Sequence, residues 1–118
     1  MNSDKIILQL NNNKKVSNSY VLIREIKVVL NVGHEDFQPE IRIKIYKSNL
    51  IKEHPYHAEV SHLVKTPLQF SPYCRDGIYS SENKAINDAI DGIVDFLKDA
   101  ISAGYDPKDE WLIKNKYF

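Results

Sequence analysis

The stretch EIKVVLNVGHEDFQPEIRIKIYK, residues 25–47, contains two segments in which apolar and polar residues alternate. Alternation with a period of two, rich in β-branched residues, predicts two half-buried strands. The connection GHEDFQP is short, so the two strands are expected to pair antiparallel. The residues predicted to face the core are Ile26, Val28, Leu30, Val32, Ile41, Ile43 and Ile45. The residues predicted to face outward are Glu25, Lys27, Val29, Asn31, Glu40, Arg42, Lys44 and Tyr46.

The hydrophobic period changes after residue 80. An apolar residue now recurs every third or fourth position, as in an amphipathic helix that packs against a core. The members of this stripe are Ile86, Ile90, Ile93, Leu97 and Ile101. Ser80 or Ser81 can cap the amino end, and Gly104 suits the position after the carboxyl cap. The pattern predicts one long helix over about 82–103.

The remaining segments give weaker patterns. KIILQL (Lys5–Leu10) predicts a first short strand, and the polar tract after it makes residues 1–19 partly flexible. Tyr56–Val64 predicts a further strand, and Leu68–Phe70 a short edge strand between turn-forming residues. Residues 105–118 predict a short C-terminal element, either helix or strand.

These elements predict one α+β domain over residues 1–118. Its antiparallel sheet has three to five strands, and the long helix packs on one face. Open edge strands allow a homodimer whose seam is a pair of edges.

Composition narrows the classes of function. Lys+Arg and Asp+Glu both number 16, so the formal net charge is zero, which argues against general nucleic-acid or membrane binding. The chain has one cysteine, Cys74, and therefore no internal disulfide. The apolar run near the amino end is too short for a signal peptide, and no segment is long enough to cross a membrane. A cytoplasmic protein is expected.

Three of the four histidines lie in HPYHAEVSH, residues 54–62. Side chains that share a face of a strand are separated by an even number of residues, whereas His57 and His62 are five apart. His54 precedes Pro55 and is expected at or before the start of the strand. The spacing favours ordinary strand and loop histidines, with a metal-dependent hydrolase as the weaker alternative.

Sequence motifs of catalysis and phosphate binding are missing. The chain contains no G-x-S-x-G, no G-x-G-x-x-G and no G-x-x-x-x-G-K-[ST]. We therefore expect a protein without catalytic residues, metal or cofactor.

Acidic residues are concentrated late in the chain. Residues 71–118 hold nine acidic and six basic residues, whereas residues 1–70 hold seven and ten. At 100° per residue, four of these acids form one stripe on the predicted helix, opposite the isoleucine stripe. They are Asp88, Asp91, Asp95 and Asp99. The stripe predicts docking onto a partner protein with a basic surface, and the alternative is a merely solvated helix face.

The outward face of the two strands offers another surface. Lys27, Arg42, Lys44 and Tyr46 could neutralise and stack on single-stranded RNA. Glu25 and Glu40 share this face, however, and cross-strand charge pairing explains the pattern as well.

Residues 72–107 read PYCRDGIYSSENKAINDAIDGIVDFLKDAISAGYDP, a proline–cysteine–glycine turn, a polar cap and a helix with regularly spaced alanines. This segment resembles the HicB-like antitoxin module. The positions that carry the resemblance are Pro72, Cys74, Gly77, Ala85, Ala89, Ile93, Leu97, Gly104 and Pro107. Tyr73 stands where the family usually has glycine, and Lys84 where it has an acidic residue. The residues after Gly104 are too few for the helix-turn-helix that the family commonly adds.

The resemblance implies a binder that neutralises a small toxic partner without repressing DNA. Together with the acidic stripe, it favours a non-enzymatic binding protein that covers and neutralises a partner protein, either antitoxin-like or a phage-type inhibitor. The alternative is an RNA-binding module that uses the basic face of the sheet.

Overall fold

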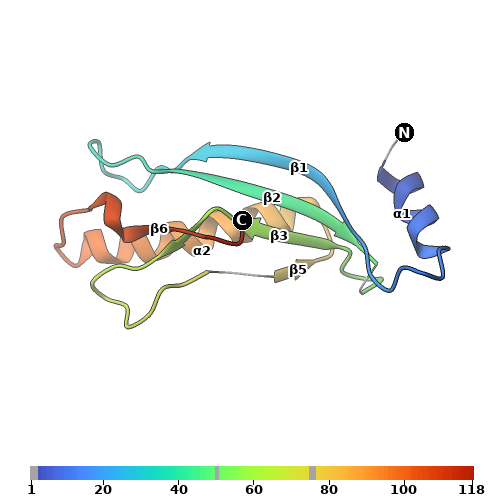
Figure 1. The fold of residues 1–118 in the computed structure, drawn as a ribbon. Helices are drawn as coiled ribbons and strands as arrows, with labels where there is room; N and C mark the ends of the chain where they lie inside the picture. The colour runs from blue at the N-terminus through green and yellow to red at the C-terminus, as the bar shows by residue number, and fades with distance from the viewer. Residues whose placement is uncertain (1–2, 50, 75–76) are drawn as a thin grey trace.

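The computed structural model describes residues 3–49, 51–74 and 77–118 (Figure 1). In chain order the elements are α1 (Ser3–Asn11), β1 (Tyr20–Val29), β2 (Glu40–Ser48), β3 (Tyr56–Val60), β4 (His62–Val64), β5 (Gly77–Tyr79), α2 (Glu82–Ser102), the 3-10 turn η1 (Asp109–Trp111) and β6 (Leu112–Lys114). Four strands form one antiparallel sheet in the order β1-β2-β3-β5, and β4 pairs with β6 in a second, small sheet. The predicted α+β class is confirmed.

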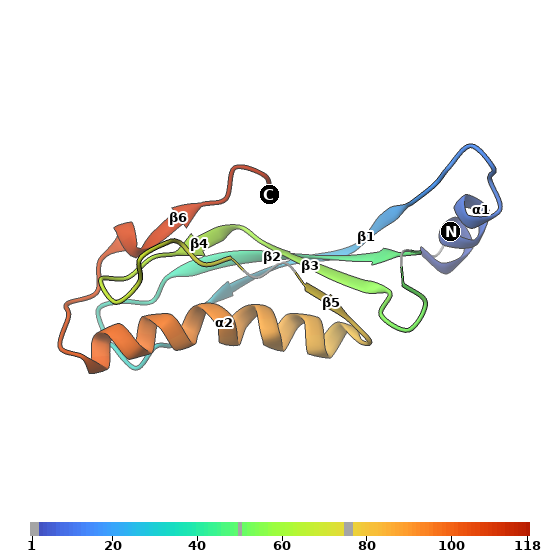
Figure 2. The same ribbon diagram turned by 90° about the horizontal axis from the view of Figure 1, so that it is seen from below.

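The domain has two main layers and measures 55 × 26 × 23 Å. Helix α2 runs along one face of the sheet and packs mainly on β2, β3 and β5 (Figure 2). On the other side, the chain returns through β6 and crosses above the sheet near its middle (Figure 2). Helix α1 lies at the far end, beside β1.

The predicted strand pair is present with the expected faces. β1 and β2 are antiparallel, with Ile26 opposite Ile43 and Val28 opposite Ile41. The three isoleucines of β2 are fully buried beneath α2, and Leu30 and Val32 are buried just beyond β1. The register shifts between Leu22 and Arg24, so the amino-terminal part of β1 bends away through a β-bulge.

Helix α2 begins and ends as the sequence predicts. Ser81 is the N-cap, and its hydroxyl oxygen accepts a hydrogen bond from the backbone N–H of Lys84 at 3.2 Å. Gly104, which follows the C-cap residue Ala103, has a φ of +97°, a conformation that residues with a Cβ rarely adopt.

The face of α2 that packs on the sheet differs from the predicted isoleucine stripe. Its buried residues are Ala85, Ala89, Ile93, Leu97 and Ala100, whereas Ile86, Ile90 and Ile101 are only partly buried at its margin. Small alanine side chains let the helix backbone approach the sheet closely. The helix is therefore rotated toward its alanine side.

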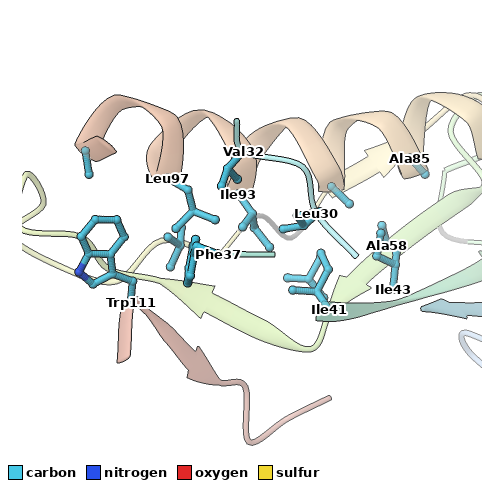
Figure 3. Close-up of a cluster of buried hydrophobic side chains, with 14 of the residues drawn as sticks. Leu30, Val32, Phe37, Ile41, Ile43, Ala58, Ala85, Ile93, Leu97 and Trp111 are labelled. Atoms are coloured by element: carbon cyan, nitrogen blue, oxygen red, sulfur yellow. The ribbon is translucent and has the colours of Figure 1, made fainter. Parts of the chain in front are cut away.

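One hydrophobic core joins the layers. Phe37, from the loop between β1 and β2, and Trp111, from η1, meet edge to face with ring centroids 6.3 Å apart. Figure 3 shows Phe37 beside Leu97 and Trp111 at the end of the cluster, so the turns at this end close the core.

Three sequence predictions were wrong in local structure. Lys5–Leu10 lies in helix α1 and is not a strand; Ile7 is buried and Asp4 accepts a hydrogen bond from Lys47 Nζ at 2.7 Å. A short apolar run does not distinguish helix from strand by period alone. Tyr56–Val64 is interrupted at Ser61 and forms β3 and β4. Leu68–Phe70 is a loop, and the edge strand on that side of the sheet is β5.

The C-terminal element, predicted as helix or strand, is the turn η1 followed directly by β6. The interruption at Ser61 lets β4 turn out of the main sheet and pair with β6. The backbone N–H of Asn115 donates to the Ser61 carbonyl at 2.8 Å, and its side-chain amide donates to the Val60 carbonyl at 2.9 Å. These bonds fasten the end of the chain to the point where β3 stops.

Candidate functional site

The four aspartates predicted as a stripe do lie along one face of α2. Asp91, Asp95 and Asp99 are exposed, and no ion pair involves any of the three within the described ranges. Asp88 differs because it is half-buried and accepts a hydrogen bond from the Tyr79 hydroxyl of β5. Three carboxylates therefore face solvent, while the fourth also braces the sheet edge against the helix.

A shallow hollow of about 360 Å³ runs beside these carboxylates. Its lining combines the four aspartates with Tyr73, Gly92 and Phe96. The Tyr73 and Phe96 rings contact each other with centroids 4.7 Å apart. The hollow is thus acidic along one side and aromatic along the other.

Gly92 makes this arrangement possible. A Cβ atom at residue 92 would lie 3.2 Å from Tyr73 Cε1 and 3.3 Å from the Tyr73 hydroxyl oxygen. Such distances are shorter than ordinary van der Waals contact, so a larger residue would displace the ring. Glycine in the helix interior lets Tyr73 lie directly on the helix backbone.

The Gln69 side chain makes hydrogen bonds that hold the loop before Tyr73. The Gln69 Oε1 atom accepts from the Thr66 backbone N–H at 2.8 Å, and Nε2 donates to the Val64 carbonyl at 3.0 Å. Within this braced loop Phe70 is fully exposed and Leu68 is 51% exposed. Exposed apolar side chains on a hydrogen-bonded loop are typical of a protein-binding surface.

The hollow is suited to a cationic side chain. Carboxylates accept hydrogen bonds from guanidinium or ammonium groups, and aromatic rings attract the same cations through their faces.

The second predicted surface, on the outer face of the sheet, is also present. The cross-strand register brings Lys27 opposite Arg42 and Lys44 opposite Glu25, with Tyr46 further along the same face of β2. Its bases have partners: Lys27 Nζ lies 3.8 Å from Glu40 Oε1, and Arg42 Nη1 lies 3.7 Å from Glu25 Oε2.

The Lys44 Nζ atom lies 4.1 Å from the centre of the Phe118 ring. All three bases of this surface are therefore engaged within the domain, which reduces the charge available to a phosphate backbone.

An aromatic cluster at the other end of this face was not predicted. The His57 ring lies 6.0 Å from the Tyr20 ring and 6.2 Å from the Tyr46 ring. Glu59 is close by, with its Oε1 atom 3.9 Å from His57 Nε2. Burial, followed by the charges of Glu59 and Glu25, raises the pKa of the Tyr46 hydroxyl, which stays protonated.

The three histidines of residues 54–62 lie in strands and a loop, as their spacing favours. His57 joins the aromatic cluster, His54 lies in the exposed loop before β3, and His62 lies on β4. In the part of the chain that the structure describes, no group of three His, Cys, Asp or Glu side chains is arranged to hold a metal ion.

His62 forms a structural hydrogen bond with its neighbour. Its Nδ1 atom lies 2.7 Å from Ser61 Oγ, which also accepts a hydrogen bond from the Arg42 backbone N–H at 2.8 Å. Burial and, secondarily, the charge of Lys114 lower the pKa of His62. A neutral ring that accepts from the Ser61 hydroxyl satisfies both groups. The pair secures the break between β3 and β4.

Sequence reasoning found the acidic half of the hollow but missed its aromatic half. Tyr73 and Phe96 are far apart in sequence, and neither forms a pattern with the aspartates. Gly92 was the available signal, because a glycine inside a helix often marks close approach of another segment.

Comparisons with protein-family models, with curated proteins and with solved structures found no match to this chain. Neither of the described helices is long and apolar enough to cross a membrane.

Proposed function

We propose that this protein is a non-enzymatic binding domain that covers and neutralises a basic partner protein, in the manner of an antitoxin or a phage-type inhibitor. The partner would contact Asp91, Asp95 and Asp99, with Asp88 at the edge of the interface. This proposal places the protein in the cytoplasm, where the thiol of Cys74 stays reduced.

One observation carries the proposal: three exposed carboxylates line a hollow whose other wall is formed by two packed aromatic rings. A helix face that is only solvated would not be expected to have two packed aromatic rings beside its carboxylates. An arriving guanidinium group could contact the carboxylates and an aromatic ring face together, and each contact is attractive for a cation.

The experiment measures binding of a fluorescein-labelled peptide of alternating Arg and Leu residues by fluorescence anisotropy. A second peptide carries citrulline, which is uncharged, in place of Arg. The protein variant Asp91→Asn/Asp95→Asn/Asp99→Asn should bind the Arg peptide roughly thirtyfold more weakly, because three exposed pairs at about 0.7 kcal/mol each sum to about 2 kcal/mol.

A matched control removes three acidic charges elsewhere. Glu35→Gln/Asp36→Asn/Glu53→Gln changes exposed loop residues and has the same net charge as the test variant. Its affinity should stay close to that of the wild type. Equal binding by wild type and test variant, or equal weakening by the control, would refute a localised site.

The wild type, the test variant and the control variant are then used as baits in a pull-down from the native cells. A partner recovered with the wild type and the control, but lost with the test variant, would support neutralisation through this surface. A partner retained by all three baits would place its contacts elsewhere.

RNA binding is the alternative proposal, and the aromatic cluster of Tyr20, Tyr46 and His57 is the observation that favours it. Stacked bases would lie on these rings, with Lys44 and Arg42 near the phosphates. Mixed single-stranded oligonucleotides should then bind with an affinity that falls as salt is raised from about 0.05 M to about 0.3 M. No detectable binding at the lower salt would end this alternative.

A further inference from the structure

Strand β1 forms one edge of the main sheet and is its longest strand, with 10 residues. No described strand pairs with its other side, which stays open in Figure 1. Residues 20–30 contain no proline, and the β-bulge of β1 lies between Leu22 and Arg24, so residues 25–29 form a regular stretch of edge. The edge is therefore able to accept another strand.

The direction of the backbone groups on this edge follows from one hydrogen bond. The Leu30 N–H donates to the Pro39 carbonyl at 2.8 Å, so the backbone groups of Leu30 point toward the neighbouring chain segment. From Glu25 to Val29 the register with β2 is regular. Because direction alternates along a strand, the N–H and C=O groups of Glu25, Lys27 and Val29 point out from the open edge.

The apolar side of β1 is incompletely covered. Helix α2 packs mainly on β2, β3 and β5, and Ile26 and Val28 are only partly buried. On the opposite face Val29 is 60% exposed and Leu22 is 47% exposed. A strand added at this edge would bury part of each surface.

The charges of β1 complement those of a second copy in one antiparallel register. With a two-fold axis at Ile26, Glu25 of each copy lies opposite Lys27 of the other, and the two Ile26 side chains meet. An axis at Glu25 would oppose two carboxylates, and an axis at Lys27 would oppose two ammonium groups. Like charges directly opposite each other destabilise a pair of strands.

The register centred on Ile26 also suits the backbone. Glu25 and Lys27 both direct their N–H and C=O groups outward, so each facing pair exchanges two hydrogen bonds across the axis. Ile26 directs its own groups toward β2 and needs no partner across the seam. Side chains and backbone thus select the same register.

We propose that two copies of this chain associate through antiparallel pairing of β1 with β1 about an axis at Ile26, which joins the two main sheets into one. Arg24 keeps its ion pair with Glu82 of α2, at 2.7 Å, within its own copy. The acidic hollow lies near β5, at the opposite edge of the main sheet from β1, where Asp88 accepts a hydrogen bond from Tyr79, so each copy can still receive a basic partner.

Sedimentation equilibrium tests this inference over about a hundredfold range of protein concentration. The apparent mass of the wild type should rise from one chain to two. Lys27→Glu places two pairs of carboxylates opposite each other across the axis and should weaken association about tenfold or more. The swap Glu25→Lys/Lys27→Glu restores opposite charges across the axis and should return the affinity to within about threefold of the wild type. It also turns the exposed Lys27–Glu40 and Arg42–Glu25 pairs of each copy into like-charged pairs, so its circular dichroism spectrum is compared with that of the wild type first.

Lys27→Pro is the second variant. The only backbone N–H that it removes points out from the edge, and the ion pair that it breaks, with Glu40, is exposed, so the folded monomer should keep its circular dichroism spectrum while association is lost. Amide hydrogen exchange adds a residue-level readout: the N–H groups of Glu25 and Lys27 should exchange more slowly as concentration rises, whereas Ile26 should not change.

A wild type that sediments as one chain at every concentration overturns the inference. So does a dimer that survives both Lys27→Glu and Lys27→Pro, because its seam must then lie elsewhere. If Lys27→Pro does not fold, Lys27→Glu and the charge swap decide. These results are independent of the Arg-peptide assay, so failure of the dimer leaves the proposed partner site standing.

Discussion

Replacing Leu97 by Ala should destabilise the domain much more than replacing Ile86 by Ala, although both residues belong to one apolar stripe in the sequence. Leu97 has no exposed surface and lies between α2 and the sheet, whereas Ile86 is only partly buried. Removing a buried leucine side chain costs about 2.7–5 kcal/mol, since it leaves a cavity. For Ile86 we expect about 1 kcal/mol, because its side chain is only partly buried at the margin of the helix and its removal leaves no enclosed cavity.

These energies correspond to well-separated melting temperatures. An unfolding entropy of about 2.1 cal/mol/K per residue gives about 0.25 kcal/mol/K for a chain of this length. A loss of about 3.5 kcal/mol therefore lowers Tm by roughly 14 °C, whereas a loss of about 1 kcal/mol lowers it by roughly 4 °C.

Urea unfolding followed by the fluorescence of buried Trp111 and by circular dichroism measures both variants. Their m-values should equal that of the wild type, since the same core unfolds. Equal destabilisation by the two substitutions would refute the rotation of α2 toward its alanine side. A larger effect at Ile86 would show that the isoleucine stripe faces the sheet.

Three further predictions concern single positions. Ser81→Ala removes the hydroxyl that caps α2 and should cost about 1 kcal/mol in urea unfolding, whereas Ser81→Asp should cost little; equal losses would contradict a capping role. Gly104→Ala forces a Cβ into a positive φ of +97° and should cost about 1 kcal/mol, although no atom lies within 4 Å of the added carbon. The folded-state pKa of His62 is lowered below its ordinary value of 6.5, so the unfolded chain binds the proton more readily. The free energy of unfolding should therefore have its full value above about pH 6.5 and decrease as the pH falls below it. His62→Gln should make this decrease with pH smaller, and an unchanged pH dependence would refute the role of His62.

The sequence predicted correctly those elements that have one face toward the core and the other toward solvent. β2 alternates between buried isoleucines and exposed charges because one face lies under α2 and the other faces outward. Ser81 and Gly104 bound α2 because the ends of a helix demand specific backbone chemistry. Such local requirements are visible in a single chain.

Elements whose surroundings come from distant residues were not predictable. KIILQL is a helix because Ile7 is buried and Asp4 forms an ion pair with Lys47 of β2. No local sequence pattern predicts this contact. The interruption at Ser61 depends likewise on the return of the chain through Asn115. In both cases a short segment follows its tertiary contacts rather than its own period.

The acidic part of the candidate site was predicted from the sequence, whereas its aromatic part was not. The alanine face of α2 accounts for both proposed surfaces. Because α2 meets the sheet through alanines, it lies over β2, β3 and β5 and leaves the apolar side of β1 partly exposed. The same rotation turns Gly92 and Phe96 toward Tyr73, which builds the aromatic wall beside the aspartates. The alanine spacing was visible in the sequence, but its consequence was not, since it depends on which strands the helix covers. The larger isoleucines dominate the periodicity, while the smaller alanines determine how closely the helix packs and therefore which surfaces stay open.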